Sequence, residues 1–597
     1  FDLGSFTENV PFISTVEPYN LHIPIGASTI AESNALPIPG WDTDFDGENR
    51  DDSFPDVGAD EGAFTVPAVY PDPANLISPA DLAIVVSPSS TLNWSAATTG
   101  GSPTGYLLYF GTNNPPSNIA DGIDLGNVTS YDPDPNLAFL TDYYWRIVPY
   151  NATGSATPAL CPIWRFQTHA TPLTGNYVIG STGTYPSFTL AITHLNAAGV
   201  GAGGVTFQAL AGETFAENPP PVTATGTLAN PILFTSSNPL AANPLITPSG
   251  GTESFGIKIE SGDYITFDHI DIANLSGFTN LIYGYWIYSI SSDAASYVTI
   301  QNCGITLDRS QAGTMAIYMN GSGASTGNQF LSNTITNSKA GIYHYPGTNS
   351  IGVQISGNTL TDVTTSGIYC RASTDGVIWN NAISFPSGAT EALIGIKAYS
   401  MTGGEIWENT ISGGTTSSTC IGMGQQAGSV EWHHNTVSNI HSNNTMEGFD
   451  SYSGTITLHN NHFHTLTSNA HVYGIELNLD AGGTTIVYNN RVHNLASNTS
   501  SSQNVTGIYI GVSSGNSTYN NMIWDLRNPG GTSAPQIAGI WVVNSTANLY
   551  YNTVFLDASG TNNNFTTATL CVTGGTSTRA NNNIFMNTST PGNAGIT

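Results

Sequence analysis

Charged side chains are scarce in this chain of 597 residues, and basic ones are the scarcest. Only 9% of the residues are charged, the formal net charge is −30, and the lysines are Lys258, Lys339 and Lys397. Without a basic patch the chain cannot neutralise a row of phosphates, so the sequence predicts no nucleic-acid partner. An anionic membrane would repel it as well, whereas divalent cations are natural partners for this charge.

Long apolar runs and paired cysteines are missing too. No apolar run approaches the roughly 18 residues of a membrane-spanning helix, so no membrane insertion is expected. The five cysteines are scattered and no CxxC occurs, which argues against a disulfide framework or a cysteine zinc site. Helical periodicity is also absent. Most polar residues are Asn, Ser and Thr, and the chain also has 64 glycines; these residue types suit turns.

An asparagine recurs through the second half of the chain at gaps of 23 to 31 residues, each followed two positions later by an apolar residue. Gly-Ile or Gly-Phe pairs, such as Gly341-Ile342 and Gly448-Phe449, recur between them. This period predicts a solenoid whose coils stack about 4.8 Å apart, with asparagine amides hydrogen-bonded from coil to coil. The repeating residues are Asn333, Asn358, Asn381, Asn409, Asn435, Asn461, Asn490, Asn521, Asn552 and Asn583.

Residues 174–597 resemble right-handed parallel β-helices of the pectate-lyase-like type. The coil itself carries the resemblance, as in VQISGNTL (residues 353–360), where apolar residues alternate before the chain turns at Asn358. The resemblance implies a long right-handed parallel β-helix whose apolar faces are buried by stacking.

Residues 72–170 alternate in period two, which predicts a small β-sandwich, and they resemble a fibronectin type III domain. Trp94 stands where the core tryptophan is expected, residues 140–151 resemble the tyrosine-corner strand, and residues 164–168 resemble the closing strand. The fold class predicted for the whole chain is therefore all-β. The combination is typical of bacterial secreted surface proteins.

Residues 1–66 form an acidic N-terminal segment that contains half of a calcium-loop pattern. Residues 42–53 place aspartates at positions 1, 3 and 5 and a glycine at position 6. Position 12 is Ser53, where an EF-hand needs glutamate, so the segment is not an EF-hand. A solvated acidic turn without an ion is the alternative. The candidate calcium ligands are Asp42, Asp44, Asp46, Glu48 and Asp51.

Aromatic rings stand two residues before many of the repeating asparagines, and alternation points them outward. Such a ladder could bind sugar rings or another protein, or its rings could stack on one another. A metal ion between His433 and His459 is conceivable, but no set of His, Asp and Glu has the spacing of metal ligands. The predicted partner surface comprises Trp379, Trp407, His433, His459, Tyr488, Tyr519 and Tyr550.

The β-helix resemblance implies an enzymatic alternative, because many such proteins cleave acidic polysaccharides. A hydrolase needs two carboxylates about 5–10 Å apart, and lyases of this type need a basic residue beside calcium-binding acids. Alternation puts Asp268 and Asp271 on opposite strand faces. Neither Asp308 with its neighbouring arginine nor Glu476 with Asp480 makes a convincing pair. We therefore expect no catalytic residue.

The two ends of the chain favour head-to-tail assembly. An acidic tail that closes the β-helix in the surface proteins it resembles stands first here, at residues 44–61, whereas residues 581–597 end inside a coil. Phe1 is no initiator, so we expect either a processed chain or one period of a longer tandem protein. Residues 1–66 would then cap the β-helix of a neighbouring copy.

The function predicted is accordingly that of a non-enzymatic extracellular or cell-surface fibre or adhesin built from copies of the chain. A β-helix protein that binds or cleaves an extracellular polysaccharide is the alternative.

Overall fold

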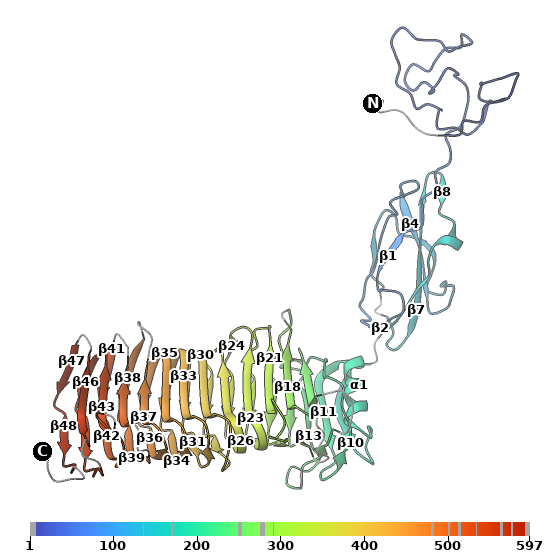
Figure 1. Cartoon of the computed structure of the whole chain (residues 1–597). Helices are drawn as coiled ribbons and strands as arrows, with labels where there is room; N and C mark the ends of the chain where they lie inside the picture. Colours follow the sequence, from blue (N-terminus) through green and yellow to red (C-terminus); the bar gives the residue numbers. More distant parts are fainter. Residues whose placement is uncertain are drawn as a thin grey trace. The chain divides into compact units, whose positions relative to one another are not determined.

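The computed structural model describes residues 8–134, 137–168, 171–248, 254–274, 281–290, 292–478, 483–498, 502–511, 515–532, 534–561, 565–574 and 577–590. The chain divides into two compact units, Phe1–Thr171 and Pro172–Thr597. Strands make up nearly all of the regular structure (Figure 1), which confirms the all-β fold class. Among the described residues, no helix is long and apolar enough to cross a membrane.

Carboxylates, rather than a sheet, hold the first part of unit 1 together. Its described residues, 8–66, form isolated β-bridges and a small core of Ile23, Ala31 and Phe64, but no β-strand. Acidic side chains accept main-chain N–H groups in place of a ladder, for example Asp60 from Ile23 at 2.6 Å. The acidic composition of this segment thus satisfies backbone donors that would otherwise lack partners.

The second part of unit 1 is a β-sandwich. One sheet has the order β1-β3-β6 and the other has the order β2-β9-β7-β4-β5, with β8 (Gly154–Ser155) paired to β7. The first sheet comprises β1 (Asn75–Ser78), β3 (Leu92–Ser95) and β6 (Ser130–Tyr131). The second comprises β2 (Ala83–Val86), β4 (Gly105–Gly111), β5 (Ala120–Asp124), β7 (Asp142–Asn151) and β9 (Trp164–Thr168).

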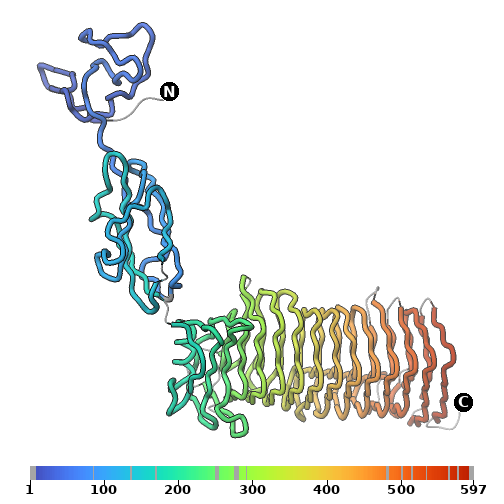
Figure 2. The backbone as a smooth tube through the Cα atoms, turned by 180° about the vertical axis from the view of Figure 1, so that it is seen from behind, coloured from blue at the N-terminus to red at the C-terminus, as the bar shows by residue number. Residues whose placement is uncertain are grey.

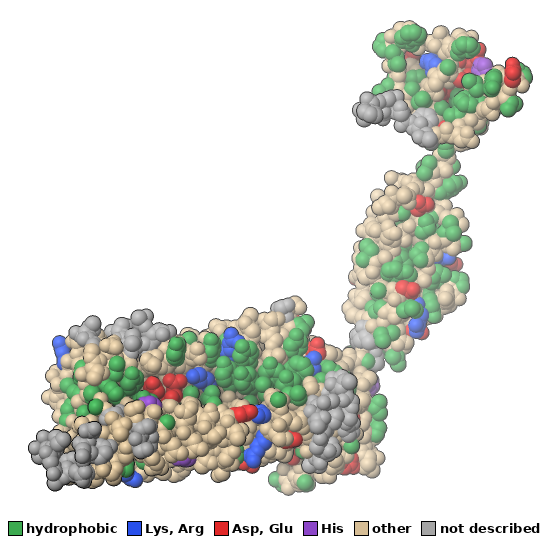
Figure 3. Space-filling model, viewed as in Figure 1, with side chains coloured by type: hydrophobic (Ala, Val, Ile, Leu, Met, Phe, Trp, Pro, Cys, Tyr) green, Lys and Arg blue, Asp and Glu red, His purple; other side chains and the backbone are tan. Residues whose placement is uncertain are grey.

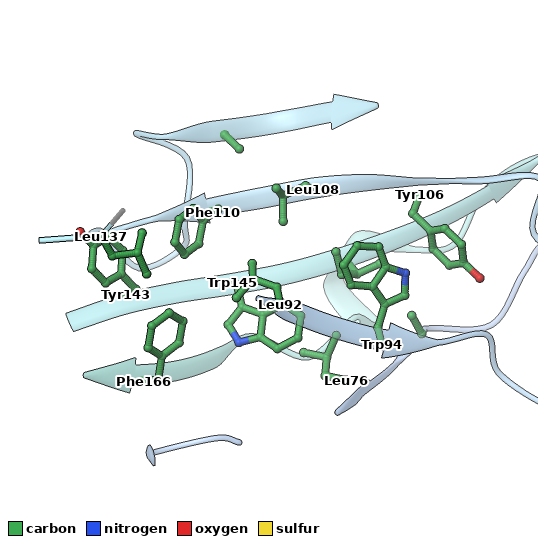
Figure 4. Close-up of a cluster of buried hydrophobic side chains, with 13 residues drawn as sticks. Leu76, Leu92, Trp94, Tyr106, Leu108, Phe110, Leu137, Tyr143, Trp145 and Phe166 are labelled. Carbon is green, nitrogen blue, oxygen red and sulfur yellow. The ribbon is translucent and has the colours of Figure 1, made fainter. Parts of the chain in front are cut away.

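Aromatic side chains from both sheets fill the core of the sandwich (Figure 4). Trp94 on β3 is buried and meets Tyr106 on β4 edge-to-face at 5.7 Å. The hydroxyl of Tyr143 on β7 accepts the N–H of Ala138 at 2.9 Å, which ties the strand to the loop before it. The sandwich lies where period-two alternation predicts it, and its assignment to the fibronectin type III family stays a prediction.

Unit 2 is a parallel β-solenoid of about 14 turns, here called coils, from residue 173 onward (Figures 1 and 2). Its strands run from β10 (Leu173–Ile179) to β48 (Ile584–Asn587), and successive coils pair in parallel along three faces. The first face includes β15 (Phe255–Glu260), β18 (Tyr283–Ser289), β21 (Met315–Gly321), the later part of β23 (Thr334–Pro346) and of β26 (Thr359–Arg371), the early part of β30 (Leu393–Trp407), β33 (Cys420–His433) and β35 (Met446–His459), then β37 (Val472–Leu477), β40 (Val505–Ile510) and β43 (Ile537–Val543).

The other two faces continue the same coils. The second face includes β28 (Val377–Trp379), the later part of β30, β33 and β35, then β38 (Thr484–Tyr488), β41 (Gly515–Tyr519) and β44 (Thr546–Tyr550). The third face includes β31 (Thr410–Ser412), β34 (Thr436–Ser442), β36 (His462–Ser468), β39 (Arg491–Ser497), β42 (Met522–Arg527) and β45 (Thr553–Leu556).

One helix, α1 (Phe188–Ala198), lies in the first coil, so the statement that helical periodicity is absent is wrong for this segment. The hydroxyl of Ser187 caps it by accepting the N–H of Leu190 at 3.2 Å, and Gly199 ends it at φ +70°. Its buried residues recur at intervals of three and four, the spacing of an amphipathic helix. They are Phe188, Ala191, Ile192, Leu195 and Ala198.

The repeating asparagines form the predicted ladder. All nine successive pairs are joined by a side-chain N–H donated to the next amide oxygen, at 2.9–3.1 Å. The residue before each has a left-handed conformation, as at Asn380 (φ 52°) and Asn460 (φ 56°). That turn points the next side chain inward, so the ladder is confirmed, and its amides are buried from Asn333 to Asn552.

A second ladder is made of the glycines in the Gly-Ile and Gly-Phe pairs together with Gly422, which precedes Met423. A Cβ placed on any of seven of them would lie 2.2–2.7 Å from a carbonyl oxygen of the glycine one coil further on. The chain bends at Gly448, so the residue before it, Glu447, and the second residue after it, Asp450, are both half-buried on the outer surface. The seven are Gly341, Gly367, Gly395, Gly422, Gly448, Gly474 and Gly507.

Candidate active site

Three carboxylates meet on the first face of the solenoid. Glu447 and Asp450 flank the glycine bend of β35, and Asp450 pairs in register with Glu476 on β37. One oxygen from each lies within 4.8 Å of the other two. We call these three residues the acidic cluster. Figure 3 shows acidic side chains on the solenoid beside a basic one, with hydrophobic side chains on either side.

Lys397 reaches the acidic cluster from two coils away. Its Nζ lies 3.6 Å from an Asp450 oxygen, and the coil between them carries Gly424 at the same register position. A Cβ on Gly424 would lie 3.3 Å from both Cδ and Nζ of Lys397. The missing side chain at Gly424 therefore leaves the space through which lysine and aspartate make contact.

Burial dominates the electrostatics of the cluster. Burial, followed by the charges of Asp450 and Glu476, raises the pKa of Glu447 to about 9. Burial and the Asp450 charge raise the pKa of Glu476 to about 7. Burial also raises the pKa of Asp450, but the Lys397 ammonium opposes that rise. At neutral pH Glu447 therefore holds a proton, whereas Asp450 is the carboxylate that a cation favours in its charged form.

The residues that pair in register with Asp450 and Glu476, coil after coil along the first face, become aromatic in both directions. The register runs from Trp286 through Lys397 and Asp450 to Trp541, nine coil steps that span roughly 43 Å at about 4.8 Å each. We call its aromatic members the aromatic strip. They are Trp286, Tyr318, Tyr343, Tyr369, Tyr509 and Trp541.

The rings on the two sides of the acids pack differently: Tyr343 and Tyr369, before the cluster, stack at 4.6 Å with an interplanar angle of 12°, whereas the rings after the cluster meet edge-to-face. Tyr473, which pairs in register with Glu447, meets Tyr509 at an interplanar angle of 64°, and Tyr509 meets Trp541 at 78°. All three are half-buried. Tyr473 also stacks on His471 at 17°, but the edge-to-face packing of Tyr509 and Trp541 leaves ring faces available for a flat apolar ligand surface, such as the face of a sugar ring. Acids in the middle and rings on both sides make this face suited to an extended chain.

The arrangement can carry acid–base chemistry. A protonated carboxyl can give its proton to a leaving oxygen, and an ionised carboxylate beside it can act as base or nucleophile. The oxygens of the cluster lie closer together than the about 6.5–9.5 Å that leaves room for a water molecule between two catalytic carboxyl groups. That spacing suits direct attack by a carboxylate better than attack by an intervening water.

Sequence reasoning missed this site because it applied strict alternation along each strand. Glu447 and Asp450 are three residues apart, which strict alternation places on opposite faces, but the bend at Gly448 returns both to the outside. Aligning the coils on their Gly-Ile and Gly-Phe pairs would have revealed it, since the acids occupy fixed offsets from those glycines. Asp480, weighed as a partner of Glu476, lies outside the described residues.

The other acids weighed from the sequence have different partners. Asp271 accepts the N–H of Gly304 at 2.6 Å, and Asp268 lies 2.7 Å from His269. Arg309 pairs with Asp362 at 3.1 Å. These contacts tie neighbouring coils or residues together, and none of them brings two carboxylates into one site.

The predicted outward aromatic ladder lies on the second face as a continuous stack. Ring centroids are 4.6–5.8 Å apart and interplanar angles are 5–13° from Trp379 to Tyr519. Tyr550 follows Tyr519 in register. His459 also contacts Glu431 at 2.8 Å. Each inner ring thus has a neighbour on both faces, which is the self-stacking alternative, and its role as a partner surface stays a prediction.

The predicted calcium residues lie in a turn held by its own side chains. One oxygen of Asp44 accepts the N–H groups of Asp46 and Glu48, at 3.0 and 2.8 Å. Asp51 accepts two N–H groups further along the chain, at 2.8 Å each. Asp42 contributes its main-chain oxygen to the same turn at 3.0 Å. Calcium binding at Asp42, Asp44, Asp46, Glu48 and Asp51 stays a prediction.

No family model and no curated protein matches the chain. Among solved structures it is similar to a GH136 lacto-N-biosidase from Eubacterium ramulus (11% identity, 63% of this chain and 68% of that one, TM-score 0.37). It is also similar to the A-module of the mannuronan C-5 epimerase AlgE4 from Azotobacter vinelandii (14%, 65% and 94%, TM-score 0.38). A third is the catalytic domain of a GH87 alpha-1,3-glucanase in complex with nigerose (13%, 87% and 100%, TM-score 0.33).

These findings correct the prediction that the chain is not an enzyme. The similar structures are two glycoside hydrolases and an epimerase, although identities of 11–14% speak for the fold alone. Glu447, Asp450 and Glu476 lie together, a group of carboxylates that the pairs weighed from the sequence did not include. What this face does chemically is therefore argued from its own residues.

Proposed function

We propose that the protein is an extracellular enzyme that cleaves a polysaccharide by acid–base chemistry at the acidic cluster. One observation carries the proposal: a protonated Glu447, a lysine-paired Asp450 and Glu476 meet in the middle of a strip of aromatic rings. The length of the strip suits a polymer rather than a small ligand.

Each residue has a distinct role in the proposed reaction. Glu447 gives its proton to the glycosidic oxygen, and the leaving sugar departs as an alcohol. Asp450, whose charged form is favoured by Lys397, attacks the anomeric carbon and forms a covalent sugar ester. Glu447, now ionised, takes a proton from water, which hydrolyses the ester and restores both groups. Because the sugar is displaced twice, first by Asp450 and then by water, this mechanism predicts retention of the anomeric configuration.

Turnover on a panel of neutral and acidic polysaccharides tests the proposal, with new reducing ends as the readout. Asp450→Asn and Glu447→Gln should each lower kcat/KM by about 10²- to 10⁴-fold. Glu405→Gln, a substitution of an exposed acid on the second face, is the matched control and should leave turnover unchanged. Turnover that survives both substitutions would place the chemistry elsewhere.

The products separate hydrolysis from related reactions at the same residues. Unsaturated sugar ends would indicate a lyase, and a changed sugar without chain cleavage would indicate an epimerase. Either result would keep the acidic cluster as the site and replace the proposed role of Asp450. Head-to-tail assembly with other copies stays a separate prediction, which microscopy of the intact chain can test.

A further inference from the structure

Three histidines gather on the third face of the solenoid, away from the strands that carry the acidic cluster. His462 and His464 are alternate residues of β36, so they share one face of that strand. His493 on β39 pairs in register with His464 one coil earlier. One ring nitrogen from each lies within 4.8 Å of the other two. We call these residues the histidine trio; the expectation that no such spacing occurs is wrong.

The three imidazoles pack closely together, and His464 and His493 stack with an interplanar angle of 7°. Nε2 of His462 lies 2.8 Å from Nε2 of His493, and two neutral rings form that hydrogen bond only if one donates. Ring centroids lie 4.2–5.3 Å apart. Burial lowers the pKa of His462 to about 4 and also lowers the pKa of His464 and of His493. The rings are therefore uncharged at neutral pH, which is the form that binds metals.

We propose that His462, His464 and His493 bind one divalent transition-metal ion, such as Zn²⁺ or Cu²⁺, through three ring nitrogens. Imidazole ligands suit these ions, whereas calcium and magnesium prefer oxygen. At a Zn–N distance of about 2.0–2.1 Å, ligand nitrogens around a tetrahedral ion lie about 3.3 Å apart. The 2.8 Å contact is shorter than that and the other nitrogens lie within 4.8 Å, so the stacked rings of His464 and His493 must turn to direct their nitrogens at the ion.

Neighbouring side chains hold two of the rings in place. Trp524 stacks on His493 at 4.1 Å with an interplanar angle of 11°, and the Thr465 hydroxyl lies 3.0 Å from Nδ1 of His464. Contacts of this kind orient metal ligands in other proteins. The ion would join β36 and β39, and so staple two successive coils together.

Two charges flank the trio and act in opposite directions. Arg491, which pairs in register with His462, is a cation that opposes a metal ion. Asp525, whose charge favours a cation at His493, is partly neutralised by its ion pair with Arg527 at 2.5 Å. Removing the Arg491 charge should therefore strengthen binding, an effect that a merely structural histidine cluster would not produce.

Calorimetric titration of the chelator-treated full chain with Zn²⁺ alone tests the proposal. We expect one ion per chain, and we expect His493→Gln to weaken its affinity by about tenfold or more. The control His441→Gln replaces a histidine of β34 on the same face that lies outside the trio, and it should leave affinity unchanged. Arg491→Gln should raise the affinity several-fold.

Copper spectroscopy on the unmutated chain keeps the test independent of variant folding. Cu²⁺ bound at the trio should give an electron paramagnetic resonance spectrum with splitting from imidazole nitrogens. An oxygen-only spectrum, no binding, or affinity that survives His493→Gln would each overturn the proposal. Affinity lost in Glu447→Gln instead would place the ion at the acidic cluster and overturn it as well.

Discussion

The asparagine ladder and the first face run along the same coils, yet they differ in burial, repetition and charge. The asparagines are identical in every coil from Asn333 to Asn583, and the members from Asn333 to Asn552 are at most 1% exposed. At the register position of Asp450, by contrast, the side chains change along the first face from Trp and Tyr to Lys, Gly, Asp, Glu, Tyr and Trp. The side chain that is identical in every coil is the one that stacking of the coils requires. The position at which the side chain changes from coil to coil is the one that can carry a functional site.

The physical reason lies in the alternatives open to each side chain. A buried amide without a hydrogen-bond partner is costly, so a coil lacking its asparagine would leave the amides of the two neighbouring coils without partners. An outward position meets solvent, so stacking there tolerates many side chains. The charges of Glu447, Asp450 and Glu476 are consequently the informative residues, because three raised pKa values in one cluster weaken the fold and need a functional reason.

The largest effect is expected from breaking the uniform ladder. Asn435 donates to Asn461 and to the Ile406 carbonyl, at 3.0 and 2.9 Å, and accepts two N–H groups from Asn409. Asn435→Ala leaves several of these buried groups unpaired, at about 1–3 kcal/mol each, so a local loss of roughly 3–6 kcal/mol is expected. Hydrogen exchange of the flanking coils measures this loss.

The matched control for that experiment is Asn443→Ala, at an exposed asparagine outside the ladder. It should change local stability by less than about 0.5 kcal/mol. Equal protection of the coils in both variants would mean that the ladder contributes no more than a surface amide.

A smaller loss is expected in the glycine ladder, at Gly448. A Cβ there would lie 2.4 Å from the Gly474 carbonyl oxygen, so Gly448→Ala should cost about 1–3 kcal/mol. Activity should fall with it, because the bend positions Glu447 and Asp450. Gly515→Ala is the control, since its nearest neighbour would lie at 3.4 Å. Thermal melts and turnover measure both effects; an unchanged melt for Gly448→Ala would count against the close packing.

Glu447→Gln should stabilise the protein at alkaline pH. The folded-state pKa of Glu447, about 9, exceeds its unfolded value of 4.5, so the folded form holds the proton more tightly. Stability is then greatest at low pH and falls as pH rises from about 4.5 to about 9. Glutamine removes that slope, with a gain on the order of 2 kcal/mol near pH 8. Chemical denaturation across pH measures it, Glu405→Gln serves as control, and a loss at pH 8 would contradict it.

The parts of the molecule that repeat were predictable, and the parts that depend on register between coils were not. Ten regularly spaced asparagines predict the solenoid, because every coil must supply hydrogen-bond partners for the same buried amides. Helix α1 occurs once, so its spacing carried no weight against the surrounding strand pattern. Glu476 follows Glu447 by 29 residues, and His493 follows His464 by the same number. Such pairs meet only once the coil lengths are known.

The charge of the acids also depends on their folded surroundings. Glu447 is one glutamate among many in the sequence, and only burial beside Asp450 and Glu476 gives it a proton at neutral pH. The acidic turn at residues 42–53 shows the converse case. A recognisable spacing of aspartates there coincides with carboxylates that already accept main-chain N–H groups.

The smallest effect is expected on the second face, where the aromatic ladder resembles the asparagine ladder in its regularity. Trp379 and Trp407 stack at 5.2 Å with an interplanar angle of 6°, so the faces between them are hidden from a sugar. Trp379→Ala with Trp407→Ala should cost about 0.5–1.5 kcal/mol of stability and leave polysaccharide affinity unchanged. Tyr509→Ala, on the first face, should weaken affinity instead. Affinity electrophoresis compares them, and a loss confined to the tryptophan pair would make the second face the binding surface.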